Sequence, residues 1–412
     1  MSDTPHFVDT KRFPRRFIVF LFLFFVAVSI GIVSLVTEND NRGSSAQWYR
    51  PNDVAVRVFS GPPDMPTFVW RAAPSFVKGI YVSAATAGYK KRFVELVDLV
   101  DRTELNAMVI DIKDDRGHLA FIPESDALKL SAASRPSLGT LREFTAPLRE
   151  KNIYLIARQF VFQDLVYVSR HPEQAVQKKT GGVWSDKKGI VWVDPASRDA
   201  WAYNAAVAKE AYAGGFDEVQ FDYVRFPTDG AISSMAFPQW DEKTPKAQVI
   251  SDFFTYLDEQ LHSVHGLVMS VDLFGLTMWQ HKYDLNIGQR LATAAPHFDY
   301  ISPMVYPSHY PPNFDGFANP AEHPYDVVYK NLVKGKPVLD ELRAATPTAR
   351  IASFRPWLQD FNLGAKYTPE MVRAQMKAAV DGGATGWILW NARNVYTEEA
   401  LSSVEIEKTL KR

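Results

Sequence analysis

The segment GGFDEVQFDYVRFP, residues 214–227, places a carboxylate inside a run of strand-forming residues. Its apolar positions are typical of a buried β-strand, yet Asp222 lies among them and Arg225 follows three residues later. An isolated carboxylate in an apolar setting costs several kcal/mol unless it is paired, protonated or used in chemistry. Asp222 is therefore the first candidate for a catalytic residue in this chain.

A second aspartate, Asp272, ends another apolar run, LVMSVDLF. Glycoside hydrolysis needs such a pair, because one carboxylic acid protonates the leaving oxygen while the other carboxylate acts as nucleophile or base. Adjacent parallel strands lie ~4.8 Å apart, so we expect both carboxyl groups to open into one cleft. The alternative is that each aspartate forms a buried ion pair with Arg158, Arg225 or Lys113.

The elements that must position these acids alternate along the chain. Eight apolar, β-rich runs are predicted as strands, and near-continuous apolar strands indicate a parallel sheet buried on both faces. Their ranges are 78–84, 107–113, 153–160, 217–223, 267–274, 300–306, 350–356 and 386–391. Pro303 is unusual within the sixth run, because proline cannot donate a hydrogen bond to a neighbouring strand.

Segments of helical periodicity lie between and after these runs. They are predicted as helices over 90–104, 138–151, 199–213, 247–264, 286–295, 324–343, 369–381 and 397–411. Eight β/α units predict an α/β protein with a closed (β/α)8 TIM barrel. An open, doubly wound sheet is the alternative, but no G-x-G-x-x-G turn follows the first strand.

Polar residues gather where the predicted strands end, and the active site of such a barrel lies at the carboxyl ends of its strands. Asp111 is a further catalytic candidate. The alternative is that Asp111 and Lys113 neutralise each other. Besides Asp222 and Asp272, we predict that substrate contacts come from Tyr81, Asp111, Lys113, Arg158, Arg225, Tyr306, Arg355 and Trp390.

The long connection between the third and fourth strands contains GGVWSDKKGIVWVDPASRDAW, residues 181–201. Its Trp184 and Trp192 could flank a cleft, and Asp194 is a further candidate for binding substrate. The alternative is structural, because Asp194 or Ser197 could cap the helix that follows.

Six segments, spread over the predicted strands, carry a family resemblance. They are KGIYVSAATAG, NAMVIDIKDDRGHLAF, GFDEVQFDYVRFP, VDLFG, YISPMVYPSHY and GWILWN. Over about residues 76–395 the chain resembles a bacterial family of glycosyl hydrolases first described as a domain of unknown function. More widely, it resembles TIM barrels of the alpha-amylase and alpha-galactosidase type.

This wider resemblance implies roles for the two acids. It implies a nucleophile at the end of the fourth strand, Asp222, and an acid/base at the end of the fifth, Asp272, with retention of anomeric configuration. Amylases have glutamate at the fifth strand, where this chain has the shorter Asp272. The alpha-galactosidase type has its acid on the sixth strand, where this chain offers only Tyr306.

Composition excludes several other chemistries. The chain contains no cysteine, so it has no disulfide, thiolate metal site or cysteine nucleophile. The net charge of −1 gives no electrostatic reason to expect nucleic acid. No H-E-x-x-H, P-loop or G-x-S-x-G motif is present. A metal-dependent deacetylase or phosphodiesterase lacks a histidine–carboxylate ligand set here, and we expect no metal or cofactor.

The N-terminal region predicts a membrane anchor. Residues 17–36 are uncharged and almost wholly apolar, which is enough to span ~30 Å of hydrocarbon. Basic residues precede this run within 1–16, so we expect a cytoplasmic N-terminus. A cleaved signal peptide is the alternative, but its apolar region is usually shorter. We read 37–75 as linker and lead-in and 76–412 as the barrel.

Together these observations predict a single-pass protein of the inner membrane whose barrel lies on the periplasmic or extracellular side. The expected function is hydrolysis of an envelope or extracellular polysaccharide by a carboxylate pair. A catalytically inert carbohydrate-binding barrel that acts as an envelope scaffold is the alternative. Only the first requires two carboxylates that converge on one cleft.

Overall fold

The computed structural model describes residues 68–402 except 126–127, 130–134 and 264–266, with the backbone of two earlier strands, 46–49 and 56–59. Its centre is a closed barrel of eight parallel strands, because β4 pairs with both β5 and β14 and β10 pairs with both β8 and β11. The predicted fold is confirmed. The barrel strands are β4 (Val77–Val82), β5 (Ala107–Lys113), β6 (Tyr154–Phe160), β8 (Glu218–Asp222), β10 (Val268–Phe274), β11 (Tyr300–Met304), β12 (Ser353–Phe354) with β13 (Trp357–Gln359), and β14 (Gly386–Trp390).

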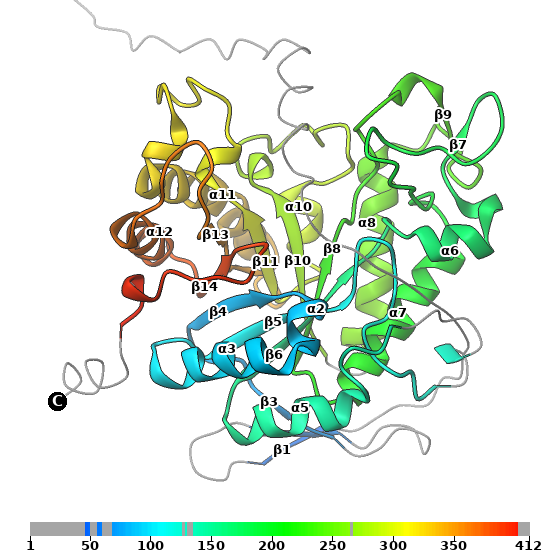
Figure 1. Cartoon of the computed structure of the whole chain (residues 1–412). Helices are drawn as coiled ribbons and strands as arrows, with labels where there is room; N and C mark the ends of the chain where they lie inside the picture. Colours follow the sequence, from blue (N-terminus) through cyan, green and yellow to red (C-terminus); the bar gives the residue numbers. More distant parts are fainter. Residues whose placement is uncertain are drawn as a thin grey trace, which may run out of the picture.

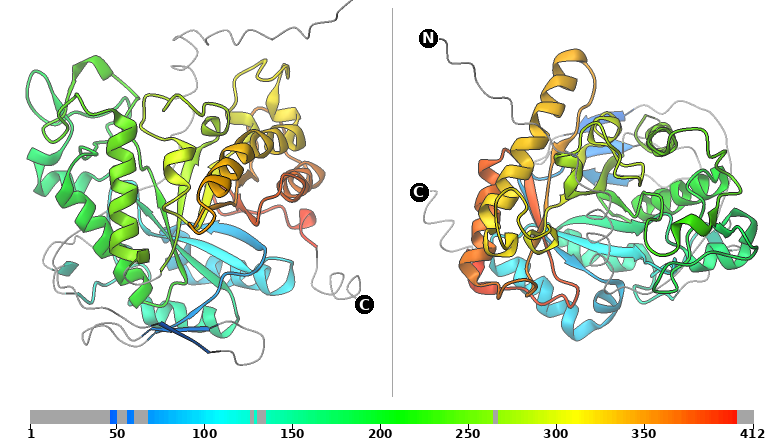
Figure 2. Two further views of the ribbon diagram at one scale, coloured as in Figure 1. Left: turned by 180° about the vertical axis from the view of Figure 1, so that it is seen from behind. Right: turned by 90° about the horizontal axis from the view of Figure 1, so that it is seen from above.

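Helices surround this barrel on the outside (Figures 1 and 2). The main ones lie close to the predicted ranges, except that α10 is only one turn and α8 ends in a π-helical turn, Asp258–His262. They are α2 (Ala84–Gly88), α3 (Lys90–Arg102), α5 (Leu141–Glu150), α6 (Leu165–Arg170), α7 (Arg198–Ala213), α8 (Lys246–Leu257), α10 (Leu291–Ala294), α11 (Pro324–Ala345) and α12 (Pro369–Asp381).

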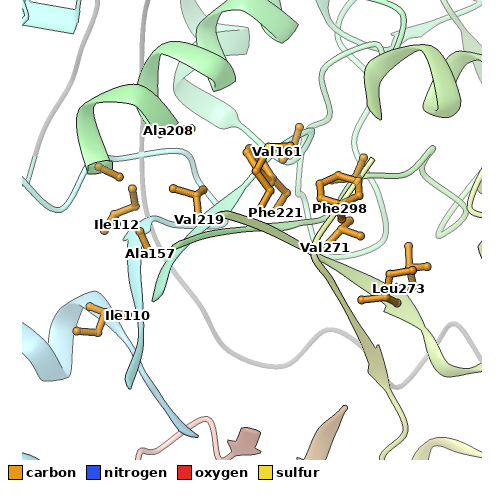
Figure 3. Packing of buried hydrophobic residues seen from close by; sticks show 14 of the residues in the cluster. Ile110, Ile112, Ala157, Val161, Ala208, Val219, Phe221, Val271, Leu273 and Phe298 are labelled. Atoms are coloured by element: carbon orange, nitrogen blue, oxygen red, sulfur yellow. The ribbon is translucent and has the colours of Figure 1, made fainter. Parts of the chain in front are cut away.

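The strands have two differently composed faces. Outward residues such as Ile110, Ala157 and Val219 pack with helix residues in one large apolar layer, of which Figure 3 shows a part. Inward residues form a smaller apolar cluster that includes Val109 and Ile156. Because side chains alternate along a strand, Glu218, Gln220 and Asp222 of β8 all face inward while Val219 and Phe221 face the helices. The alternation explains how a charged residue can occupy an apolar strand.

The seventh strand departs from its predicted range of 350–356. It occurs as two short pieces, β12 and β13, that pair with β11 at Ile301 and Met304. Pro356 lies between the pieces and has no N–H to donate, and Pro303 lies in β11 opposite this break. The two prolines interrupt the ladder, so residues 355–356 belong to neither piece.

The lead-in forms an antiparallel sheet of β1 (Ala46–Tyr49), β2 (Val56–Phe59) and β3 (Phe68–Arg71), which lies below the barrel in Figure 1. Arg71 attaches this sheet to the amino ends of two barrel strands. Its guanidinium pairs with Asp217 at 2.6 Å and donates to the carbonyl of Ile153 at 2.5 Å. A partly buried ion pair between Arg71 and Asp217 therefore attaches the lead-in sheet to the barrel.

The predicted anchor, residues 17–36, and most of the predicted terminal helix, 397–411, lie outside the described residues. Within the part of the chain that the structure describes, no helix has the length and apolar character needed to cross a membrane.

Candidate active site

A single arginine organises the carboxyl end of the barrel. Arg158, on β6, is buried and lies 2.5 Å from Asp111 through Nη1 and 2.5 Å from Asp222 through Nη2. Its Nε lies 3.5 Å from Oδ2 of Asp272. Charge-assisted bonds of this length are among the strongest in proteins. The structure thus brings together Asp222, Asp272, Asp111 and Arg158, as the sequence predicted, around one guanidinium that cannot neutralise all three acids.

Asp111 is held from two sides. Its Oδ1 accepts from Arg158, and its Oδ2 accepts a 2.5 Å hydrogen bond from the hydroxyl of Tyr81 on β4. Burial raises the pKa of Asp111 even though Arg158 acts in the opposite direction. Asp111 is only 1% exposed, and its two bonds suit it to hold Arg158 in place.

Asp272 has no exposed surface. Its Oδ1 accepts from Gln220 at 2.5 Å and from the indole N–H of Trp357 at 2.7 Å. Burial, and secondly the charge of Asp222, raise the pKa of Asp272 well above its usual range. This environment favours the protonated carboxyl group, as expected when two like charges share a dry site.

Asp222 is buried as well, with 5% of its surface exposed, but it reaches a pocket. It lines this pocket together with Tyr223, Arg225, Phe274, Gln289 and Met304. Asp272 is not among the lining residues. The expectation that both carboxyl groups open into one cleft is therefore wrong for this conformation, because Gln220 and Trp357 hold Asp272 inside the barrel.

The backbone after Asp222 makes a tight turn. Tyr223 has a positive φ of 55°, which is uncommon for a residue with a bulky side chain. In this conformation its N–H donates to Oδ1 of Asp222 at 2.6 Å. One carboxylate oxygen of Asp222 thus receives the Tyr223 amide and the other receives Arg158, so its orientation is fixed.

An aromatic wall lies on the other half of the barrel mouth. Tyr81 stacks on Trp390 with ring centres 6.1 Å apart, and Tyr306 and Phe361 lie 5.6 Å and 5.3 Å from the same indole. Trp390 is partly exposed. The acids on β5, β8 and β10 and the arginine on β6 therefore face aromatic rings on β4 and β14 and from just beyond β11 and β13. Such a combination suits a polar ligand with apolar ring faces.

The chain matches the family described as "Putative glycosyl hydrolase domain" over residues 79–396. It belongs to that family. The family resemblance seen in the six sequence segments is confirmed, and the matched residues include every strand of the barrel except the first two residues of β4.

Solved structures similar to this glycosyl hydrolase domain share its barrel. The PgaB (BpsB) glycoside hydrolase domain from Bordetella bronchiseptica is 14% identical with a TM-score of 0.55, covering 79% of this chain and 99% of its own. Alpha-L-fucosidase isoenzyme 2 from Paenibacillus thiaminolyticus is 14% identical with a TM-score of 0.50, covering 82% and 50%. At such identity the likeness shows the fold alone.

A hypothetical protein from Ruminiclostridium thermocellum ATCC 27405 is 37% identical over 47% of this chain and 96% of its own, with a TM-score of 0.43. No curated protein sequence matches the chain.

Lys113 does not join the site, contrary to its predicted role. The register between β5 and β6 shifts between Asp111 and Lys113, so that Lys113 pairs with Gln159. The ammonium group then binds Asp164 at 2.8 Å and Asn204 at 3.0 Å, on the helix side of the strand. A bulge reverses the expected alternation, and Lys113 neutralises Asp164 instead of Asp111.

Arg355 and Asp194 also lie elsewhere. Arg355 follows β12 and points into the barrel, where Nη1 binds Glu218 at the start of β8 at 2.8 Å. The Asp194 carboxylate accepts from the backbone N–H groups of Ala196, Gln239 and Trp240, and so links two long loops. Ser197, not Asp194, caps α7. The alternative that Ser197 caps this helix is confirmed, whereas Asp194 instead holds the backbone of the two loops.

Four residues of the site escaped sequence reasoning. Gln220 and Trp357 hold Asp272, and Gln289 bridges the ends of β8 and β10 through the carbonyls of Val224 and Asp272. Burial, with the charges of Asp115 and Asp111, raises the pKa of Asp114 to about 8. Of these residues, only Gln220 could have been identified from the sequence. It lies two residues before Asp222 in the same strand and therefore faces the same side of the sheet.

No group of three or more histidine, aspartate or glutamate side chains in the described part of the chain is arranged to hold a metal ion. The acids of the site are instead arranged around Arg158.

Proposed function

We propose that this protein is a retaining glycoside hydrolase that cleaves an envelope or extracellular polysaccharide, with Asp222 as the nucleophile. The observation that carries the proposal is that Asp222 alone of the three clustered acids lines the pocket, with both oxygens held in a fixed direction. A rigidly placed carboxylate is what attack on an anomeric carbon requires.

In the proposed reaction an Asp222 oxygen attacks the anomeric carbon while the glycosidic bond breaks and the leaving oxygen takes a proton. Water then cleaves the glycosyl–Asp222 ester, and the product keeps the configuration of the substrate. Arg158 holds Asp222 in place by a charge-assisted hydrogen bond, while Asp111 and Tyr81 hold Arg158. The aromatic rings around Trp390 offer apolar faces on which sugar rings can stack.

We assign Asp272 a positioning role that departs from the acid/base role implied by resemblance. A proton donor must come within hydrogen-bond reach of the leaving oxygen, whereas Asp272 is enclosed by Gln220, Trp357 and Arg158. Because a neutral Asp272 needs no counter-charge, the positive charge of Arg158 remains available to pair with Asp111 and Asp222.

Direct assay of the full chain tests the function. We expect release of reducing ends from an envelope or extracellular polysaccharide, and proton NMR of the first product should show the retained anomer. A 2-fluoro glycoside of the cleaved sugar should leave a covalent adduct on Asp222, found by peptide mass spectrometry. Saturable polysaccharide binding without any bond cleavage would instead support the inert binding barrel.

The proton donor is tested by leaving-group dependence. We expect Asp272→Asn to reduce kcat/KM for good and poor leaving groups by a similar factor, because a positioning residue acts on Asp222 in both cases. Loss of activity only with poor leaving groups would make Asp272 the proton donor after all.

The same assay on Asp114→Asn examines a second acid with a raised pKa, which follows β5 directly. With a pKa of about 8, this carboxyl group is protonated at neutral pH and loses its proton above that value. If it donates the proton, wild-type kcat falls as the pH rises through about 8, and the variant loses this alkaline limb together with its activity on poor leaving groups.

We further propose that residues 17–36 anchor the barrel, uncleaved, to the inner membrane with the active site on the periplasmic or extracellular side. The uncharged run and the basic residues before it support this arrangement. The protein should remain in the membrane fraction after carbonate washing and retain its N-terminal peptide in mass spectrometry. A mature N-terminus between residues 37 and 50 would contradict the anchor.

A further inference from the structure

Arg225 differs from the other buried arginines in the described part of the chain. Arg158 and Arg355 each have a carboxylate oxygen within 2.8 Å, at 2.5 Å and 2.8 Å respectively. For Arg225 the corresponding distance is 3.9 Å, from Nη2 to Oδ2 of Asp229. Only 2% of the Arg225 side chain is exposed, so its charge is withdrawn from water without a close counter-charge.

The hydrogen bonds of Arg225 use only one of its nitrogens. Nη1 donates to the carbonyl of Phe226 at 3.2 Å and to the hydroxyl of Thr228 at 3.5 Å. Burial raises the pKa of Asp229, the nearest carboxylate, although the charge of Arg225 acts in the opposite direction. The guanidinium edge formed by Nε and Nη2 is therefore short of an anionic partner.

Aromatic rings hold the guanidinium in place. Its central carbon lies 4.6 Å from the ring centre of Trp192, 5.3 Å from Phe274 and 5.7 Å from Tyr223. Contacts of this kind stabilise the cation through the ring faces and leave in-plane N–H groups for a ligand. They also restrict the side chain to one place.

That place is the wall of the pocket on which Asp222 opens. Phe274 and Met304 contribute apolar surface there, while the Gln289 side chain is committed to the backbone at Phe274, Val224 and Asp272. The charged groups offered to a ligand in this pocket are Asp222 and Arg225. A sugar whose anomeric carbon meets Asp222 would therefore present its substituents to a fixed cation.

We propose that Arg225 binds a carboxylate carried by the sugar next to Asp222, so that the preferred substrate is a glycan containing uronic acid. This inference rests on the proposed hydrolase site and names its substrate class. The planar fork of arginine matches a carboxylate in two parallel hydrogen bonds. A sulfate ester offers similar oxygens and is the competing source of negative charge.

Binding of free monosaccharides tests the inference without any bond cleavage. Glucuronate, galacturonate and mannuronate are each compared with the neutral hexose of the same configuration, and galactose 6-sulfate serves as the sulfated probe. Saturation-transfer NMR titrations of the full chain give the affinities. We expect at least one uronate to bind roughly 10- to 100-fold tighter than its neutral counterpart, as for a charge-assisted hydrogen bond.

Arg225→Gln should lower the affinity for the uronate much more than the affinity for the neutral sugar, and Arg225→Lys should retain part of the preference. Equal affinities for uronate and neutral sugar in the wild type would overturn the inference, as would tighter binding of the sulfated probe. An equal loss for both sugar types in Arg225→Gln, with a lower melting temperature, would show a purely structural arginine.

These outcomes separate the inference from the proposed function. A uronate preference lost in Arg225→Gln, without cleavage of any glycan, would retain the inference and reject hydrolysis. Hydrolysis of neutral glycans by a wild type that shows no preference for uronate would retain hydrolysis and reject the inference.

Discussion

Asp222→Asn should abolish glycan hydrolysis while the barrel stays folded. The amide has the shape of the carboxylate but cannot form the glycosyl ester, and loss of a nucleophile typically lowers kcat by roughly 10⁴-fold or more. The measurement is kcat on the best polysaccharide or aryl glycoside found for the wild type, together with the melting temperature of each protein.

Asp111→Asn is the matched control. It removes the other carboxylate that lies 2.5 Å from Arg158 but leaves the pocket wall intact. Both variants should lose similar stability, because each takes one counter-charge from the same guanidinium, and only Asp222→Asn should lose nearly all activity. Equal activity losses in the two variants would make Asp222 a structural partner of Arg158 and not a nucleophile.

Arg158→Met should have the largest effect on stability. It leaves Asp111 and Asp222 buried without their counter-charge, and removal of one partner from a buried ion pair costs about 3–5 kcal/mol. We expect the free energy of unfolding, measured by urea titration at neutral pH, to fall by at least this amount. Activity should be lost as well, because Asp222 is no longer oriented.

The pH dependence of this variant follows from the same charges. Without the guanidinium, which opposes the effect of burial, the folded-state pKa of Asp111 should rise further, so the folded state binds protons more tightly. The stability defect should therefore be largest at high pH and shrink towards pH 4. A defect that does not change between pH 4 and pH 8 would show that loss of packing, and not of charge, destabilises the variant.

The barrel could be predicted because its signals are local. Apolar runs and amphipathic segments report which face is buried, and the strands begin and end within a few residues of their predicted positions. The seventh strand was misplaced because its ends depend on two prolines in adjacent strands, Pro303 and Pro356. That relation is visible only once the strands are paired.

The cluster of acids was predicted for the same reason, since strand ends converge in a barrel. The direction of individual side chains was not. Lys113 turns away because of a bulge between β5 and β6, and Arg355 reaches from the break after β12 to Glu218 at the other end of the interior. The enclosure of Asp272 depends on Gln220 and Trp357, which come from different strands.

The inward residues of β8 have a consequence for how the chain acquires its structure. Each needs a partner from another strand: Glu218 binds Arg355 from beyond β12, Gln220 binds Asp272 of β10, and Asp222 binds Arg158 of β6. In a half-barrel that stops after β8, the first two partners would be missing and a buried glutamate would have no cation. The inward side chains of β8 can therefore be buried only after strands from much later in the sequence have paired. This makes barrel closure a cooperative, all-or-none step and disfavours a stable half-barrel intermediate.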